Sequence, residues 1–223
     1  MSLGAAIRND VVLQIRYGLY AVSVVMIVFW GALLGMAGRN LSLSTVALLP
    51  ALVVVNLLIT TFYFMAALVL FEKAEGVLAA LVVTPLGSSS YLLSKTISLT
   101  LLATVETFAI AAIVFEDIRW PSAIAGSLLL GFFYACAGFV TVVPFSSINR
   151  FLLPSVLVVS FLFLPLLGHF ELVPRWLMLL HPIEPALRLM TGGGLPAAAA
   201  ACGWCVAAFI LARRVFDRFV VQA

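Results

Sequence analysis

The stretch TVALLPALVVVNLLITTFYFMAALVL, residues 45–70, contains no charged side chain. It is longer than the roughly 20 apolar residues that one helical crossing of a lipid bilayer requires, so we expect it to span a membrane. Similar apolar stretches predict five more spans, at about 17–37, 96–115, 121–144, 151–167 and 195–212. The expected fold class is therefore an all-α integral membrane protein with six transmembrane helices in a single domain, residues 1–223.

The overall composition agrees with lipid as the main solvent of this chain. Hydrophobic residues make up 65% of its 223 residues and charged residues 9%, whereas soluble domains contain about 45–50% apolar and about 25% charged residues. Six spans leave no room for a soluble catalytic domain. The net charge of +3 involves no basic run, so we expect no nucleic-acid partner.

The distribution of the 12 lysine and arginine residues predicts the orientation of the spans. With the amino terminus inside, eight of them fall on the cytoplasmic side: Arg8, Arg16, Lys73, Lys95, Arg150, Arg213, Arg214 and Arg218. The other four fall outside: Arg39, Arg119, Arg175 and Arg188. Because cytoplasmic loops carry an excess of positive residues, this distribution favours a cytoplasmic location for both termini.

Residues 1–16 precede the first span and predict a helix that lies in the membrane interface. Apolar residues recur there at every fourth position and would share one helical face: Leu3, Ile7, Val11 and Ile15. Charged residues occupy other positions of the same segment, as in interfacial amphipathic helices. We expect this elbow helix on the cytoplasmic side.

The segment FEKAEGVLAALVVTPLGSSSYLLSK, residues 71–95, predicts a cytoplasmic loop with a short helix of its own. Glu72, Lys73 and Glu75 form its polar face, apolar residues follow, and Thr84-Pro85 ends the helix. An ordinary solvated loop is the alternative. A loop that only separates two spans needs no apolar helix after its charges, which favours a docking role.

The same loop resembles the first cytoplasmic loop of type-2 ATP-binding-cassette exporter permeases. The resemblance rests on E-x-x-E-G-x-L-x-x-L-x-V-T-P-L, residues 72–86, and on YLLSK, residues 91–95. The segment 173–188 is similar to the proline-tryptophan turn before the last span of that family. With six spans and an amphipathic start, the resemblance covers nearly the whole chain, and its overall character is similar to the drug-export branch of the fluoroquinolone-exporter kind.

The resemblance implies a function in ATP-driven export of a hydrophobic or amphipathic small molecule. It implies that the loop forms a coupling helix that fits a groove on a separate nucleotide-binding ATPase subunit. That partner would bind ATP-Mg, and this chain would bind no cofactor. The permease would work as a homodimer or as a heterodimer with a second permease, in the inner membrane of a bacterium or archaeon. The coupling residues would be Glu72, Lys73, Glu75, Gly76, Leu78, Leu81, Thr84, Pro85 and Tyr91.

Polar residues within two of the spans are candidates for a substrate path. Asn56, Thr60 and Tyr63 follow one another at spacings of four and three, so they share one face of an α-helix. Glu106 lies midway along the third span, where a carboxylate costs about 2.5–3.5 kcal/mol on insertion scales. Hydrogen bonding between helices explains these residues equally well.

Residues 168–194 predict an outer, re-entrant-like hairpin, because prolines at positions 174, 182 and 185 divide the segment into two short helices. Trp176 is expected at interfacial depth. In an exporter this hairpin would serve as the outer gate. Its candidate gate residues are Pro174, Trp176, Pro182 and Arg188.

Three other functions are open at this point. The haem-exporter permease of cytochrome maturation is similar in length and number of spans. An intramembrane enzyme or a non-transporting assembly factor would belong to other classes. The sequence contains no P-loop and no serine-protease motif, and its spans offer no cluster of metal ligands. We therefore expect no catalytic residue and no metal site.

Overall fold

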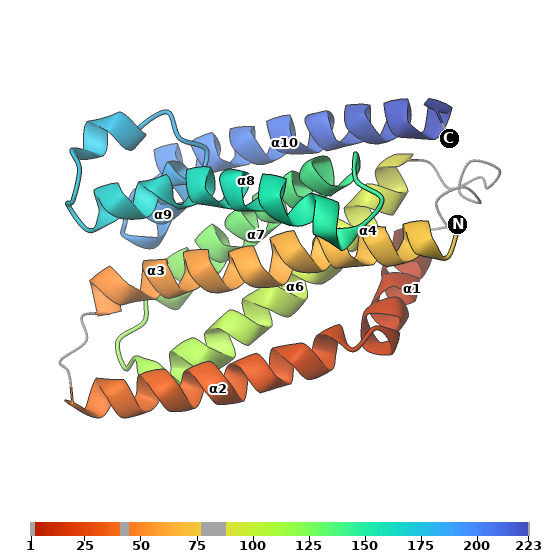
Figure 1. Cartoon of the computed structure of the whole chain (residues 1–223). Helices are drawn as coiled ribbons and strands as arrows, with labels where there is room; N and C mark the ends of the chain where they lie inside the picture. The colour runs from red at the N-terminus through yellow and green to blue at the C-terminus, as the bar shows by residue number, and fades with distance from the viewer. Residues whose placement is uncertain (1–2, 41–44, 77–87, 223) are drawn as a thin grey trace.

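The computed structural model describes residues 3–40, 45–76 and 88–222, and the regular elements in that part of the chain are all helical. Six long apolar helices run side by side as candidate membrane spans (Figure 1). The elements are α1 (Leu3–Arg16), α2 (Leu19–Asn40), α3 (Thr45–Leu57), η1 (Leu58–Tyr63), α4 (Phe64–Ala74), α6 (Ser88–Val114), α7 (Trp120–Val142), α8 (Ile148–His169), η2 (Arg175–Met178), α9 (Glu184–Met190) and α10 (Gly194–Gln222).

The predicted all-helical chain with six spans is confirmed, but four of the spans are longer than expected, the fifth by a few residues at each end. The second span, formed by α3, η1 and α4 together, reaches Ala74 instead of residue 70. The third begins at Ser89 instead of residue 96, and the last extends to Phe219. Charged residues marked the expected span ends. Glu72 and Lys95 nevertheless lie within helices, because each is paired with an opposite charge in the protein.

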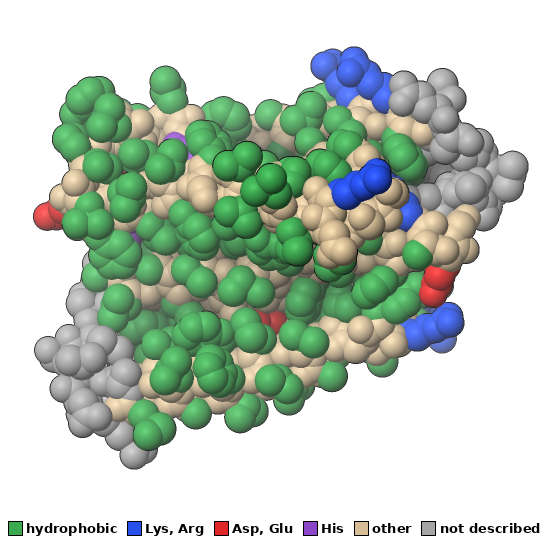
Figure 2. Space-filling model, in the orientation of Figure 1, with side chains coloured by type: hydrophobic (Ala, Val, Ile, Leu, Met, Phe, Trp, Pro, Cys, Tyr) green, Lys and Arg blue, Asp and Glu red, His purple; other side chains and the backbone are tan. Residues whose placement is uncertain are grey.

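Helices α6 and α7 lie at the centre of the bundle. Helix α6 packs against α2, α1 and α3, and α7 packs against α10, α9, η1 and α4. Helices α2, α8 and α10 lie at the periphery and bury only a small part of their length. Hydrophobic side chains cover the flank of the bundle (Figure 2), which fits contact with lipid tails.

The two ends of the bundle carry different elements. Both termini lie at one end, together with α1, the end of α4 and the start of α6 (Figure 1). The short helices η2 and α9 lie at the opposite end. The two ends correspond to the two sides of the predicted topology, and the assignment of one side to the cytoplasm stays a prediction.

The predicted amino-terminal helix is present as α1, and its large apolar residues do not face the bundle. Its buried residues are Ala6, Asp10 and Gln14, whereas Val12 and Ile15 are exposed. Helix α1 therefore turns its polar face toward α6, because Asp10 finds a buried lysine partner there. Its apolar residues remain on the outside, where lipid can contact them.

The segment between the last two spans contains two short helices, η2 and α9, as its prolines predicted. Helix α9 packs against α7 and α10. Trp176, in η2, is 68% exposed. The re-entrant character of this segment stays a prediction.

Candidate functional site

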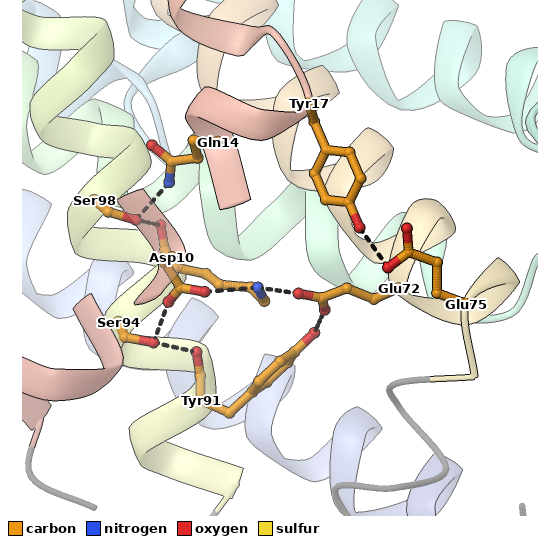
Figure 3. Close-up of polar contacts among 9 residues, drawn as sticks. Asp10, Gln14, Tyr17, Glu72, Glu75, Tyr91, Ser94 and Ser98 are labelled. Atoms are coloured by element: carbon orange, nitrogen blue, oxygen red, sulfur yellow. Dashed lines mark hydrogen bonds and ion pairs between the residues drawn. The ribbon is translucent and has the colours of Figure 1, made fainter. Parts of the chain in front are cut away.

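Three buried charged side chains meet at the end of the bundle that carries the termini (Figure 3). Lys95 of α6 lies 2.8 Å from an oxygen of Asp10 on α1 and 2.5 Å from an oxygen of Glu72 on α4. The exposed fractions are 1% for Lys95, 5% for Asp10 and 2% for Glu72. We call these three residues the buried charged cluster. It joins three helices that are far apart in the sequence.

The second oxygen of each carboxylate in the cluster accepts a hydrogen bond as well. The hydroxyl of Tyr91 donates to Glu72, and the hydroxyl of Ser94 donates to Asp10. The Lys95 ammonium also lies 4.8 Å from the centre of the Tyr91 ring. Buried charges are tolerated when they are both paired and hydrogen-bonded, and removal of one partner leaves an uncompensated charge. The cluster is therefore a rigid connection between α1, α4 and α6.

The remaining charged residues at the end of α4 contact other elements. Lys73 donates to the carbonyl oxygens of Val143 and Phe145, just beyond the end of α7. Its ammonium also lies 4.5 Å from the centre of the Phe219 ring on α10. Glu75 accepts a hydrogen bond of 2.8 Å from the hydroxyl of Tyr17, between α1 and α2. The end of α4 and Glu75 directly after it thus contact α6, α10, the residues just beyond α7 and Tyr17.

These contacts change the expected picture of the coupling residues. The prediction that Glu72 belongs to an exposed polar face is wrong, because its carboxylate is buried against Lys95. Lys73 is half-buried and Tyr91 is buried, whereas Glu75 and Gly76 are exposed. Gly76 adopts a positive φ of 71° directly after α4, a conformation that favours glycine. The predicted coupling residues Leu78, Leu81, Thr84 and Pro85 lie outside the described residues.

Asp10 and Lys95 are site residues that the sequence alone did not reveal. A signal was available in the spacing of Ala6, Asp10 and Gln14, since a small and two polar residues at every fourth position form a second face of α1. That face meets α6, where Gln14 donates to the hydroxyl of Ser98 at 2.7 Å. The pairing of Asp10 with Lys95 itself could not be read from spacing, because 85 positions separate the two residues.

A second polar site lies between the spans. Thr60 of η1 donates to Glu106 of α6 at 3.1 Å, and Asn56 of α3 donates to the hydroxyl oxygen of Thr107 at 2.9 Å. The side chain of Ser23 on α2 also faces the Glu106 carboxyl group, without meeting hydrogen-bond geometry. All five of these residues are buried.

Tyr63 does not join this polar site, although its spacing from Asn56 predicted a shared face. The chain is a π-helix over Leu58–Tyr63, and a π-helix takes more residues per turn than an α-helix, so the expected face is lost. Tyr63 is half-buried and packs against Phe62 and Phe151 instead. Asn56, Thr60 and Glu106 do meet as predicted.

The predicted gate residues lie at the opposite end, where His181 and Glu184 are buried polar groups. The ring nitrogen Nε2 of His181 lies 3.1 Å from the carbonyl oxygen of Phe161, and Nδ1 accepts from the amide of Ile183 at 3.3 Å. This is the bonding of a neutral imidazole, and burial lowers the pKa of His181. Burial raises the pKa of Glu184, opposed by the nearby charges of Arg175 and Arg188.

The four candidate gate residues do not form one group. Pro174 precedes η2, Trp176 projects outward, and Pro182 follows His181. Arg188 is exposed on α9 and lines a cavity of about 310 Å³ with Glu184, between α9 and α10. Trp176 does not line that cavity.

Six long apolar helices, with most charges near the ends of the bundle and polar groups buried between helices, define a multi-pass membrane protein. The whole chain, residues 1–223, matches the family model of the fluoroquinolones export permease proteins, and the chain belongs to that family.

Two similar curated proteins are fluoroquinolones export permease proteins of Mycobacterium tuberculosis, from strains CDC 1551 / Oshkosh and ATCC 25618 / H37Rv. Each is 28% identical to this chain over 190 residues, which cover 83% of this chain and 78% of the relative.

Proposed function

We propose that this chain is the membrane-spanning permease subunit of a type-2 ATP-binding-cassette exporter. A separate nucleotide-binding ATPase subunit binds ATP-Mg and docks at the end of the bundle that carries the termini. This end faces the cytoplasm, so both termini are cytoplasmic. The permease pairs with a second permease, identical or related, in the inner membrane.

The observation that carries this proposal is the connection of the two helices that flank the proposed coupling segment. Glu72 lies in the last turn of α4, shortly before residues 77–87, and Lys95 lies in the second turn of α6, shortly after them. The two side chains are ion-paired. A displacement of the coupling segment by the ATPase would therefore move α4 and α6 together.

The contacts of α4 give this displacement a route into the rest of the bundle. Asp10 extends the charged cluster to α1, and Lys73 holds the end of α7 through two backbone carbonyls. Closure of the ATPase would thereby tilt the spans as a connected set. The exposed residues Glu75 and Gly76 are those placed to touch the partner directly.

The exported compound is a hydrophobic or amphipathic small molecule. The apolar spans support this choice, and the relatives from M. tuberculosis are named for fluoroquinolones. Asn56, Thr60 and Glu106 contribute polar groups to the path, whereas Tyr63 contributes packing. The hairpin with Pro174, Trp176, Pro182 and Arg188 acts as the outer gate.

Co-purification tests the proposed partnership. The permease is co-expressed with a candidate P-loop ATPase subunit from the same organism, and complex formation and ATP hydrolysis are measured in detergent. We expect a stable complex whose ATPase rate depends on the permease. Glu75→Ala should lower this coupling, whereas Glu116→Ala, which removes an exposed acid at the opposite end, should leave it unchanged. The proposal is wrong if the permease neither binds the ATPase nor alters its rate.

A further inference from the structure

We propose that Asn56 and Glu106 form the polar floor of a binding site for a lipophilic amine, which enters sideways from the lipid between α2 and α3. This inference rests on the proposed export function and specifies the chemical class of the exported compound.

The site begins with a cavity of about 270 Å³ between α2, α3 and the end of α6. Its walls are apolar, and they include Trp30 and Leu34 of α2, Leu52 and Val55 of α3, and Phe115. Asn56 provides the polar part of the lining. Such a cavity suits a ligand with a hydrophobic body and a single polar end.

The polar end must supply hydrogen-bond donors. Among the described residues, three buried oxygens beside the cavity have no hydrogen-bond partner: Oδ1 of Asn56, which lines the cavity, and Oε2 of Glu106 and Oγ of Ser23 next to it. The amide of Asn56 is oriented by Thr107, whose hydroxyl donates to the carbonyl of Ala103 and so must accept from the amide NH2 group. The hydroxyl of Thr60 is committed to the other oxygen of Glu106. The carboxyl oxygen of Glu106, the amide oxygen of Asn56 and the hydroxyl oxygen of Ser23 are thus all available as acceptors.

The polar end should also carry a positive charge. Within the part of the chain that the structure describes, Glu106 takes part in no ion pair, and the buried lysine of the bundle is held by Asp10 and Glu72. A carboxylate within a membrane requires a counter-charge or a proton. An ammonium group supplies three donors together with the counter-charge, and charge-assisted hydrogen bonds are stronger than neutral ones.

The arrangement of α2 supports entry from the lipid. This helix packs mainly against α6 and leaves side chains such as Val24, Val28 and Leu33 exposed. Figure 2 shows acidic atoms at the bottom of the furrow that separates α2 from the helices above it, surrounded by hydrophobic side chains. An amine with an apolar body concentrates in the bilayer and would reach the cavity through this furrow.

Trp30 provides a reporter for the test, because it lines the cavity. The purified permease, without ATPase or ATP, is placed in lipid nanodiscs and titrated with a bromoalkylamine, which quenches tryptophan fluorescence. The bromoalkyl alcohol of the same chain length is the uncharged control. The contribution of Trp30 is obtained as the difference in fluorescence quenching between the wild type and Trp30→Phe. We expect the amine to reach half-saturation at a concentration about tenfold lower than the alcohol does. One charge-assisted hydrogen bond is strong enough to account for a difference of this size.

Substitutions test which residue causes the preference for the amine over the alcohol. Glu106→Gln should abolish the difference between amine and alcohol, whereas Glu116→Gln should retain it. Ala51→Phe fills the cavity and should prevent quenching by both compounds. Equal affinities for amine and alcohol in the wild type would overturn the proposal without any substitution, and so would an amine preference that survives in Glu106→Gln. Because no ATP is present, a failure of transport would refute the proposed function and leave this result unaffected.

Discussion

Lys95 of α6 and Asp10 of α1 form a buried ion pair with 2.8 Å between their charged atoms, although 85 positions separate them in the sequence. Glu72 completes the arrangement from α4. The pair fixes the amino-terminal helix to the centre of the bundle, next to the segment that we propose as the docking point of the ATPase. Its loss should affect both stability and energy coupling.

In the buried charged cluster, we expect neutralisation of the lysine to lower folding stability more than neutralisation of one carboxylate. The cluster holds two carboxylates and one ammonium, so Lys95→Met leaves two buried negative charges without a partner. We expect a loss of about 3–5 kcal/mol, the usual cost of removing one member of a buried pair. Glu72→Gln leaves Lys95 paired with Asp10 and should cost clearly less.

Thermal unfolding in detergent, followed by size-exclusion chromatography, measures the two effects. Arg150→Met is the control, because Arg150 is an exposed cation at the same end of the bundle. Equal melting temperatures for Lys95→Met and Arg150→Met would show that the cluster contributes nothing to stability.

At Gly138, α7 lies too close to the π-helix of the second span to leave room for a larger side chain. A Cβ atom at this position would lie 2.5 Å from the carbonyl oxygen of Phe62 in η1, and backbone cannot move aside as a side chain can. We expect Gly138→Ala to destabilise the protein by about 1–3 kcal/mol through overpacking. Gly203→Ala is the matched control, since nothing lies within 4 Å of that Cβ position.

The two glycine variants should respond in opposite directions. Alanine favours a helix over glycine by about 0.8–1.0 kcal/mol, so Gly203→Ala should be neutral or stabilising. A melting temperature for Gly138→Ala at or above that of the wild type would contradict the close approach of α7 and η1.

Lys73 predicts that the end of α4 stabilises the end of α7. Its ammonium donates to two carbonyl oxygens there, Val143 and Phe145, and hydrogen bonds from charged groups contribute about 1.5–3 kcal/mol. Lys73→Met keeps an apolar stem beside Phe219 but removes both bonds, so we expect a loss in that range. Arg214→Met removes an exposed cation of α10 and should change the melting temperature little. Indistinguishable melting curves would exclude a role of Lys73 in this contact.

His181 predicts a pH dependence of stability. Because burial lowers its folded-state pKa below the usual 6.5, the unfolded chain binds a proton more readily than the folded protein. Stability should therefore be unaffected by His181 above about pH 7 and should fall as pH decreases from about 6.5 toward the folded-state pKa. Melting temperatures measured from pH 8 to pH 5 test this expectation.

The comparison with His181→Gln isolates this effect from that of Glu184. The folded-state pKa of Glu184 is raised, so the folded protein binds a proton at this carboxyl group more readily than the unfolded chain does. Protonation of Glu184 therefore increases folding stability as pH falls, opposite to the effect of His181. The glutamine variant keeps a donor for the carbonyl of Phe161 but does not titrate. Its melting temperature should decline less than that of the wild type below pH 6.5, and parallel curves would contradict the assignment.

The sequence predicted the spans well because hydropathy over some twenty residues reports membrane insertion directly. It failed where a charge is compensated by a distant partner. Lys95 and Glu72 were assigned to a loop because single-sequence hydropathy treats every charge as solvated, whereas the fold buries them against each other. The outward-facing apolar side of α1 follows from the same pairing, since Asp10 and Gln14 determine which face docks.

The second polar site was predicted in part for a similar reason. Asn56 precedes the π-helix and Thr60 is only its third residue, so their shared face survives. Tyr63 comes at the end of η1, and no residue pattern in LITTFY signals the change in helical pitch. The pairing of Thr60 with Glu106 required the packing of two spans, which spacing within one helix cannot supply.

ATP-dependent uptake into inside-out vesicles tests the central claim most directly. Vesicles that contain the permease and the ATPase with which it co-purifies are supplied with ATP and a fluoroquinolone, and the trapped drug is measured over time. We predict uptake that requires both proteins and hydrolysable ATP. Uptake that is unchanged when the permease is omitted, or no uptake although both proteins are folded and bound to each other, would contradict the account.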